Sequence, residues 1–128
     1  MTNIIFHESK HGAPETLDKI TEAIKEKGLN VFATIKHGDA AAKNGLELRD
    51  TSLIIFGNPM MGTTLMQADQ RMGLELPMKI LVWQDAAGKV FAGFRDPELL
   101  LSEYELDSAR EVVAKAKSVL TALVQSAG

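Results

Sequence analysis

The stretch IIFGNPMMGTT contains the residues whose types and spacing come closest to a nucleotide site. Gly57 and Gly62 stand five positions apart, as the glycines of a phosphate-binding P-loop do, and Thr64 occupies the hydroxyl position. A P-loop also needs a lysine charge against the β and γ phosphates, but Thr63 stands where that lysine should be. Pro59 removes a backbone N–H group from the same loop. These two features argue against nucleotide hydrolysis.

A weaker expectation remains for this segment, because the chain passes there from a predicted strand into a predicted helix. A helix N-terminus presents free N–H groups and the positive end of a dipole, which can bind a carboxylate or a phosphate. Asn58, Thr63 and Gln67 place polar side chains around the corner and are candidate ligand-binding residues. The favoured interpretation of the segment is nevertheless a tight turn that needs glycine at two backbone positions.

The segment HESKH, from His7 to His11, matches the H-E-x-x-H motif of zinc proteases. In that motif a helix turns both histidines toward one ion, whereas here the segment follows a short apolar stretch and runs into Gly12 and Pro14. In an extended chain the two histidines would be about 13 Å apart, which is too far for one ion. We interpret the match as coincidental and predict no metal site.

Histidine and methionine supply the remaining groups that could do chemistry. His37 ends a predicted strand close to Asp39, and a histidine in such a place can change its charge near neutral pH. It is the fourth candidate ligand-binding residue. Methionines could bind a soft metal or form an adaptable surface, although packing is the favoured interpretation. Five of the six methionines lie in one segment: Met60, Met61, Met66, Met72 and Met78.

The composition argues against several classes of function. The chain has 128 residues, 45% hydrophobic and 24% charged, as expected for one globular domain over residues 1–128. Its net charge is -3 and charges of both signs are interspersed, so nucleic acid is a poor partner prediction. The absence of cysteine excludes disulfides and thiolate sites. No apolar run resembles a signal peptide or a membrane span, so we expect a cytoplasmic protein with no membrane contact.

Hydrophobic periodicity and local breakers predict the elements that must position these residues. Strands are predicted for IIF, LNVFATIKH, TSLIIFG, MKILVWQ and VFAGF, with DAAGK as a hairpin turn. The first helix ends at Gly28, which suits a left-handed cap, and the second runs from Thr63 through Met72. Helices or helical turns are predicted to begin at Pro14, Asp39, Thr63, Asp96 and Asp107.

The main elements follow one another in the order β-α-β-β-α-β-β-α. Hairpins beside helices predict an α+β domain of two layers, with a mixed or antiparallel sheet and the helices on one face. The other face must then be solvated or covered by a second copy of the chain. Phe32, Phe91 and Phe94 are candidates for that face, so we expect a homodimer.

Long segments of the chain also resemble a known family. ETLDKITEAIKEKGLNVFATIKH, LIIFGNPMMGTTLMQAD, GLELPMKILVWQD and FRDP are together similar to domain-of-unknown-function family 302 (DUF 302) and its TT-type structural relatives from thermophiles. The resemblance covers about Phe6 to Leu101, and it implies a small α+β fold that commonly forms dimers and has no established activity. His37 matches the histidine that ends the family's second strand. The central loop of the family is matched by Gly57, Asn58, Pro59, Gly62, Thr63, Met66 and Gln67.

Three functions are compatible with these observations, and the sequence does not decide whether a cofactor is bound. We favour a homodimeric binding module for a small ligand, and an anion is a suitable ligand for it. Its candidate residues are His37, Asn58, Thr63 and Gln67. The first alternative is an enzyme that uses His37 as acid or base, with Asp69 or Asp85 as its partner. The second is a haem or soft-metal protein with His37 and a methionine as ligands.

Overall fold

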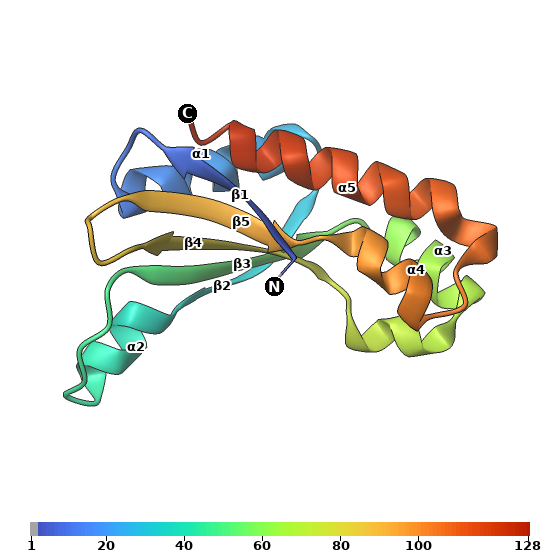
Figure 1. Ribbon diagram of the computed structural model, residues 1–128, viewed down its shortest axis with the longest axis horizontal. Helices are drawn as coiled ribbons and strands as arrows, with labels where there is room; N and C mark the ends of the chain where they lie inside the picture. The colour runs from blue at the N-terminus through green and yellow to red at the C-terminus, as the bar shows by residue number, and fades with distance from the viewer. Residues whose placement is uncertain (1–2) are drawn as a thin grey trace.

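A five-stranded sheet forms one layer of the protein in a computed structural model that describes residues 3–128 (Figure 1). The strand order is β1-β5-β4-β3-β2, and every neighbouring pair is antiparallel. The sheet is therefore of the antiparallel kind among those that the sequence predicted. The strands are β1 (Ile4–Ser9), β2 (Asn30–Lys36), β3 (Thr51–Gly57), β4 (Met78–Gln84) and β5 (Val90–Arg95).

The second layer consists of two long helices, α1 and α5, which cover the same face of the sheet (Figure 1). The helices are α1 (Ala13–Glu26), α2 (His37–Lys43), α3 (Pro59–Ala68), α4 (Leu100–Glu103) and α5 (Arg110–Gln125). Short 3₁₀ segments join them: η1 (Gln70–Leu74), η2 (Pro97–Leu99) and η3 (Asp107–Ala109). The predicted α+β fold with two layers is confirmed. Within residues 3–128, no helix combines the length and the apolar character needed to cross a lipid bilayer.

The main core lies between the sheet and the two long helices. The apolar face of α1 packs there through Ile20 and Ile24, both fully buried, and Leu123 of α5 lies beside them. The helix α1 has a proline in its first turn and is followed by Gly28 at φ +75°, a left-handed backbone that glycine adopts without strain. A second, smaller core of Leu65, Met72, Leu106, Ala109 and Val113 joins α3 and η1 to the start of α5.

The opposite face of the sheet carries no helix layer, and large apolar side chains are exposed on it. Phe6 is 59% exposed, and its ring packs edge-on against Trp83 and Phe91 at centroid distances of 6.3 Å and 5.6 Å. Phe91 therefore belongs to the open face, as predicted. The same prediction is wrong for Phe94, which is 4% exposed, because alternation along β5 turns it into the helix-covered core.

Three predicted helix starts differ from the structure. The helix α3 begins at Pro59 with Asn58 as its N-cap, several residues before Thr63, because a proline fits the first helical position. It ends at Ala68, and η1 follows it. The helix α2 includes Asp39, which was predicted to cap it. Asp107 begins a 3₁₀ turn and makes no capping hydrogen bond to α5.

Candidate functional site

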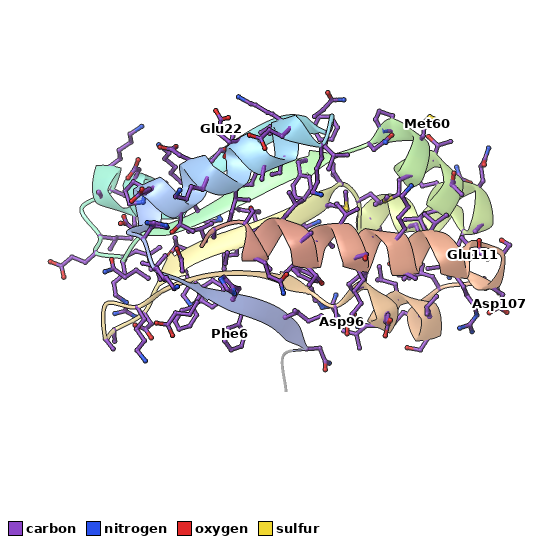
Figure 2. All side chains as sticks on the ribbon, turned by 90° about the horizontal axis from the view of Figure 1, so that it is seen from above. Phe6, Glu22, Met60, Asp96, Asp107 and Glu111 are labelled. Atoms are coloured by element: carbon purple, nitrogen blue, oxygen red, sulfur yellow. The ribbon has the colours of Figure 1, made fainter. Side chains whose placement is uncertain are left out.

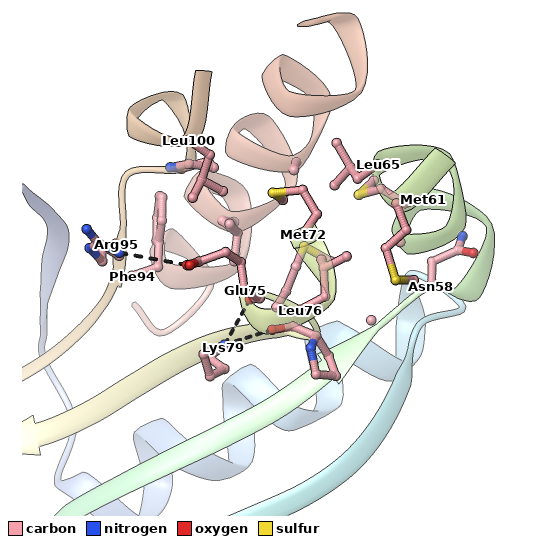
Figure 3. A pocket seen from close by; sticks show the side chains of 18 of the residues that line it. Asn58, Met61, Leu65, Met72, Glu75, Leu76, Lys79, Phe94, Arg95 and Leu100 are labelled. Carbon is pink, nitrogen blue, oxygen red and sulfur yellow. Dashed lines mark hydrogen bonds and ion pairs between the residues drawn. The ribbon is translucent and has the colours of Figure 1, made fainter. Parts of the chain in front are cut away.

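A cavity of about 460 Å³ lies where one end of the sheet meets α3, η1 and α5 (Figure 3). Segments far apart in the sequence build it, from Phe32 in β2 to Leu120 in α5. Its volume falls within the range of roughly 300–1,000 Å³ that small-molecule sites occupy. The apolar side chains that line it include Met61, Leu65, Met66, Met72, Leu76, Phe94 and Leu120.

The strand-to-helix corner after β3 forms one wall of this cavity. The Asn58 Oδ1 atom accepts a hydrogen bond from the N–H of Met60 at 2.9 Å, so this side chain caps α3. The N–H of Gly62 donates to the Asn58 carbonyl at 3.2 Å, as in a regular helix. A Cβ atom on Gly62 would meet Leu76 Cδ1 at 3.7 Å, which is an ordinary contact. The corner is thus a capped helix start beside open space.

The two glycines of the P-loop-like pattern have ordinary backbone conformations. Neither Gly57 nor Gly62 has a positive φ, and the glycines that do are elsewhere in the chain. The prediction of a tight turn that needs glycine at both positions is therefore wrong. At Gly57 the space is shared with Phe32, whose Cε2 atom would be 3.5 Å from an added Cβ. Gly62 faces the cavity, so its missing side chain contributes to the free volume.

One side of the cavity rim is built around Glu75. Its Oε2 atom accepts a hydrogen bond from the Tyr104 hydroxyl at 2.8 Å, and its Oε1 atom lies 3.8 Å from Nη1 of Arg95. The hydrogen bond to Glu75 raises the pKa of Tyr104, since a phenolate there would face a carboxylate. Glu75 is therefore already engaged by a hydrogen-bond donor and a cation.

Two further charged side chains line the cavity, Lys79 and Asp96. The Nζ atom of Lys79 donates hydrogen bonds to the carbonyls of Glu75 and Pro77, each at 3.0 Å. The Oδ2 atom of Asp96 lies 3.3 Å from Nζ of Lys117. Among residues 3–128, Lys79 is thus the charged lining residue that forms no ion pair.

A buried carboxylate, Asp69, joins η1 to the segment before α5, beside the cavity. Its Oδ1 atom accepts from the backbone N–H and the Nε–H of Arg71, both at 3.0 Å, and its Oδ2 atom accepts from Nη2 of Arg71 at 2.7 Å. The N–H of Glu105 also donates to Oδ2, at 3.0 Å. These bonds, those from the Arg71 side chain first, hold the pKa of Asp69 well below its usual range. Asp69 thereby ties the turn after α3 to the segment before α5.

The structure separates the four candidate residues named from the sequence. Asn58 and Thr63 line the cavity. Gln67 is exposed on α3 and does not line it. His37 begins α2, and Figure 1 shows α2 and α3 at opposite ends of the molecule. Only the first two therefore lie together, and a ligand-binding role for any of the four stays a prediction.

The enzyme and haem hypotheses both depended on His37. In residues 3–128 this imidazole forms no ion pair with a carboxylate. Asp69 is held by Arg71, and Asp85 accepts hydrogen bonds from the N–H groups of Ala87 and Lys89 in the hairpin turn. Within residues 3–128 a direct dyad with either aspartate is absent, and α3, which carries Met61 and Met66, lies at the other end of the molecule from α2 (Figure 1).

The zinc-like segment HESKH does not lie on a helix. His7 is in β1, and His11 follows the strand, where its Nδ1 atom lies 3.4 Å from Glu15 Oε2. Throughout residues 3–128, no three or more histidine and acidic side chains gather in a group that could hold a metal ion. Four of the five clustered methionines, all except Met60, line the cavity instead.

Sequence reasoning missed the charged rim and the Asp69 contacts. Lys79 and Arg95 alternate with apolar residues in β4 and β5. This alternation predicts a solvent-facing side chain, but it cannot tell one on a cavity rim from one on the open surface. Asp69 left a clearer signal. It stood among apolar residues on one face of the predicted helix, and a carboxylate in such a place must find partners.

Several curated proteins are similar to part of this chain. Fluoride-specific ion channel FluC 1 of Brucella suis is 40% identical over 115 residues, which are 90% of this chain and 45% of that protein. Fluoride-specific ion channel FluC 2 of Brucella melitensis is also 40% identical, over 90% of this chain and 43% of its own length. The chain therefore spans less than half the length of these curated relatives.

A solved structure identifies the fold, and a family model identifies the family. A crystal structure of an uncharacterized conserved DUF302 protein from Bacillus stearothermophilus superposes with a TM-score of 0.88 and covers 100% of both chains. At a sequence identity of 21%, this superposition shows a shared fold and nothing more. The family model described as domain of unknown function DUF302 matches residues 5–123, nearly the whole chain. The protein therefore belongs to the DUF302 family.

Proposed function

We propose that this domain binds a small molecule in the cavity between α3, η1, α5 and the end of the sheet. The carrying observation is an apolar cavity of about 460 Å³ with a few polar groups at its rim, which is the usual build of a small-molecule site. Asn58 and Thr63 belong to the proposed site, while Gln67 and His37 lie outside the cavity. The fluoride-channel name of the Brucella relatives is not carried over, because the match covers less than half of those proteins.

A panel of small apolar and amphipathic compounds tests this function. We expect at least one class to raise the melting temperature, since a ligand that binds only the folded state stabilises it by mass action. His37→Ala and Gln67→Ala serve as controls outside the cavity and should leave the shift unchanged. A flat response to the whole panel contradicts the proposal. A shift that disappears in either control variant places the ligand elsewhere.

We also propose that two copies associate through the open face of the sheet. Three large apolar side chains are exposed on it, Phe6 by 59%, Ile4 by 43% and Ile35 by 40%, and exposed apolar surface of this kind often marks a protein–protein contact. The helix α2 buries none of its residues within the chain, and it projects from the end of β2 away from α1 and α5 (Figure 1). A helix of seven residues gains little from its own hydrogen bonds, so a partner surface would stabilise it.

The substitution Phe6→Lys should convert the dimer into a monomer, because it places a charge among the apolar side chains of the proposed interface. Met60→Lys is the matched control. Met60 is 78% exposed and lies on α3, well away from Phe6 (Figure 2). Light scattering after sizing chromatography gives the mass of each variant. The proposal fails if the unchanged protein is monomeric at micromolar concentration, or if both lysine variants dissociate equally.

A further inference from the structure

We propose that the cavity takes an amphipathic monoanion, with its apolar body among the methionines and its carboxylate bound by Lys79. This inference rests on the proposed ligand-binding function and adds the chemical class of the ligand. A carboxylate is the simplest headgroup of this kind, since one ammonium group can neutralise it. Two features of the cavity indicate such a ligand: a rim cation without a carboxylate partner, and an inner wall of adaptable apolar side chains.

Lys79 is the rim cation that is free to bind an anion. Its Nζ atom uses two hydrogen bonds, both at 3.0 Å and both to main-chain carbonyls. An ammonium group has three donors, so one remains for a ligand. The two carbonyls also fix the position of the group on the rim, next to η1 (Figure 3). A ligand carboxylate there would pair with a charge that has no carboxylate partner within residues 3–128.

The other rim charges are paired and favour the same polarity of ligand. Glu75 is bound by the Tyr104 hydroxyl and lies 3.8 Å from Arg95. Asp96 is paired with Lys117. A cationic ligand would therefore meet carboxylates whose charge is already balanced by a neighbouring cation. Arg95 stays with Glu75 in this arrangement, which leaves Lys79 as the cation available to an anionic ligand.

The inner wall suits a flexible apolar body of variable shape. Met61, Met66, Met72 and Met78 line the cavity together with Leu76. Methionine is unbranched and adapts its side chain to irregular partners, so such a wall can follow an alkyl chain. The wall has few polar groups away from the rim, and the side-chain oxygen of Asn58 already accepts the hydrogen bond that caps α3. The polar part of a ligand must therefore stay at the rim.

Calorimetric titration with decanoate, 1-decanol and decylamine below their aggregation concentrations tests the proposal. These probes share one alkyl chain and differ in headgroup charge. We expect decanoate to bind most tightly, with an affinity that falls as salt is added, because exposed charges are screened. In Lys79→Gln the affinity for decanoate should fall about tenfold, the equivalent of one charge-assisted hydrogen bond, while decanol should bind as before.

Lys43→Gln is the matched control, since Lys43 lies on the distant helix α2 and should not affect any probe. The inference is overturned if decanol or decylamine binds as tightly as decanoate, or if Lys79→Gln leaves decanoate unchanged. In either case the cavity remains a small-molecule site. If none of the three probes binds and the wider compound panel is also flat, the proposed function itself fails.

Discussion

Replacing Asp69 by alanine should lower the melting temperature of the protein by roughly 10 °C, a large effect for one substitution. Asp69 is 9% exposed and is the only charged residue that is buried within residues 3–128. Its removal leaves the N–H groups of Arg71 and Glu105 without their acceptor and deprives the Arg71 guanidinium of its partner. Differential scanning calorimetry or circular dichroism gives the shift.

Asp107→Ala is the matched control for this prediction. Its side chain is 92% exposed and pairs with Arg110 at 3.2 Å, and such surface pairs contribute little to stability. Its melting temperature should therefore change by no more than a degree or two. Equal shifts in the two variants would show that the hydrogen bonds of Asp69 do not stabilise the junction between η1 and the segment before α5.

The acid stability of the protein should depend on the same carboxylate. The folded state lowers the pKa of Asp69 below its unfolded value of about 3.9, so the stabilisation is complete above that pH. It is lost as the pH falls through the folded pKa. Melting curves between neutral pH and about pH 2 should therefore fall more steeply for the unchanged protein than for Asp69→Asn. Parallel curves would contradict this assignment.

The fold could be predicted from the sequence because its signals are local. The alternation in β2 and β5, the apolar run of β3 and the apolar stripe of α1 each require one kind of element. Errors occurred where two local rules compete. At the start of α3, both Asn58 and Thr63 are good N-caps, and Pro59 decides in favour of the first because it is preorganised for the first helical turn.

The site was predicted in part because only one of its walls is a continuous segment. The corner after β3 pointed to Asn58 and Thr63 correctly as neighbours. The opposite wall comes from η1, β5 and α5, and no local pattern shows that these segments meet. His37 was grouped with the corner on residue type alone. In the antiparallel pairing of β2 with β3, Asn30 lies opposite Gly57 and Lys36 lies opposite Ser52. His37, which follows Lys36, is therefore at the far end of the sheet from the corner after Gly57.

Replacing Gly62 by leucine should abolish binding of an alkyl ligand while the protein stays folded. Gly62 lies inside α3 with an ordinary helical hydrogen bond, so its backbone does not require glycine. A side chain there points toward Leu76 across free space in the cavity. Glycine in a helix lowers the free energy of unfolding by about 0.5–1 kcal/mol relative to alanine. The substitution removes this penalty, and the stability gained offsets crowding by the larger side chain.

Gly62→Ala separates the two effects, because it gives the helix its gain while adding one methyl group at an ordinary contact distance. We expect this variant to be more stable by about 0.5–1 kcal/mol and to keep most of its affinity for decanoate. Gly62→Leu should bind decanoate more than tenfold less tightly, since its side chain occupies the volume that the ligand needs. If the leucine variant is folded and binds as the unchanged protein does, the ligand does not enter this cavity. Gly62 would then have no role that explains its cost to the stability of α3. If binding is lost instead, Gly62 is needed to keep the cavity open.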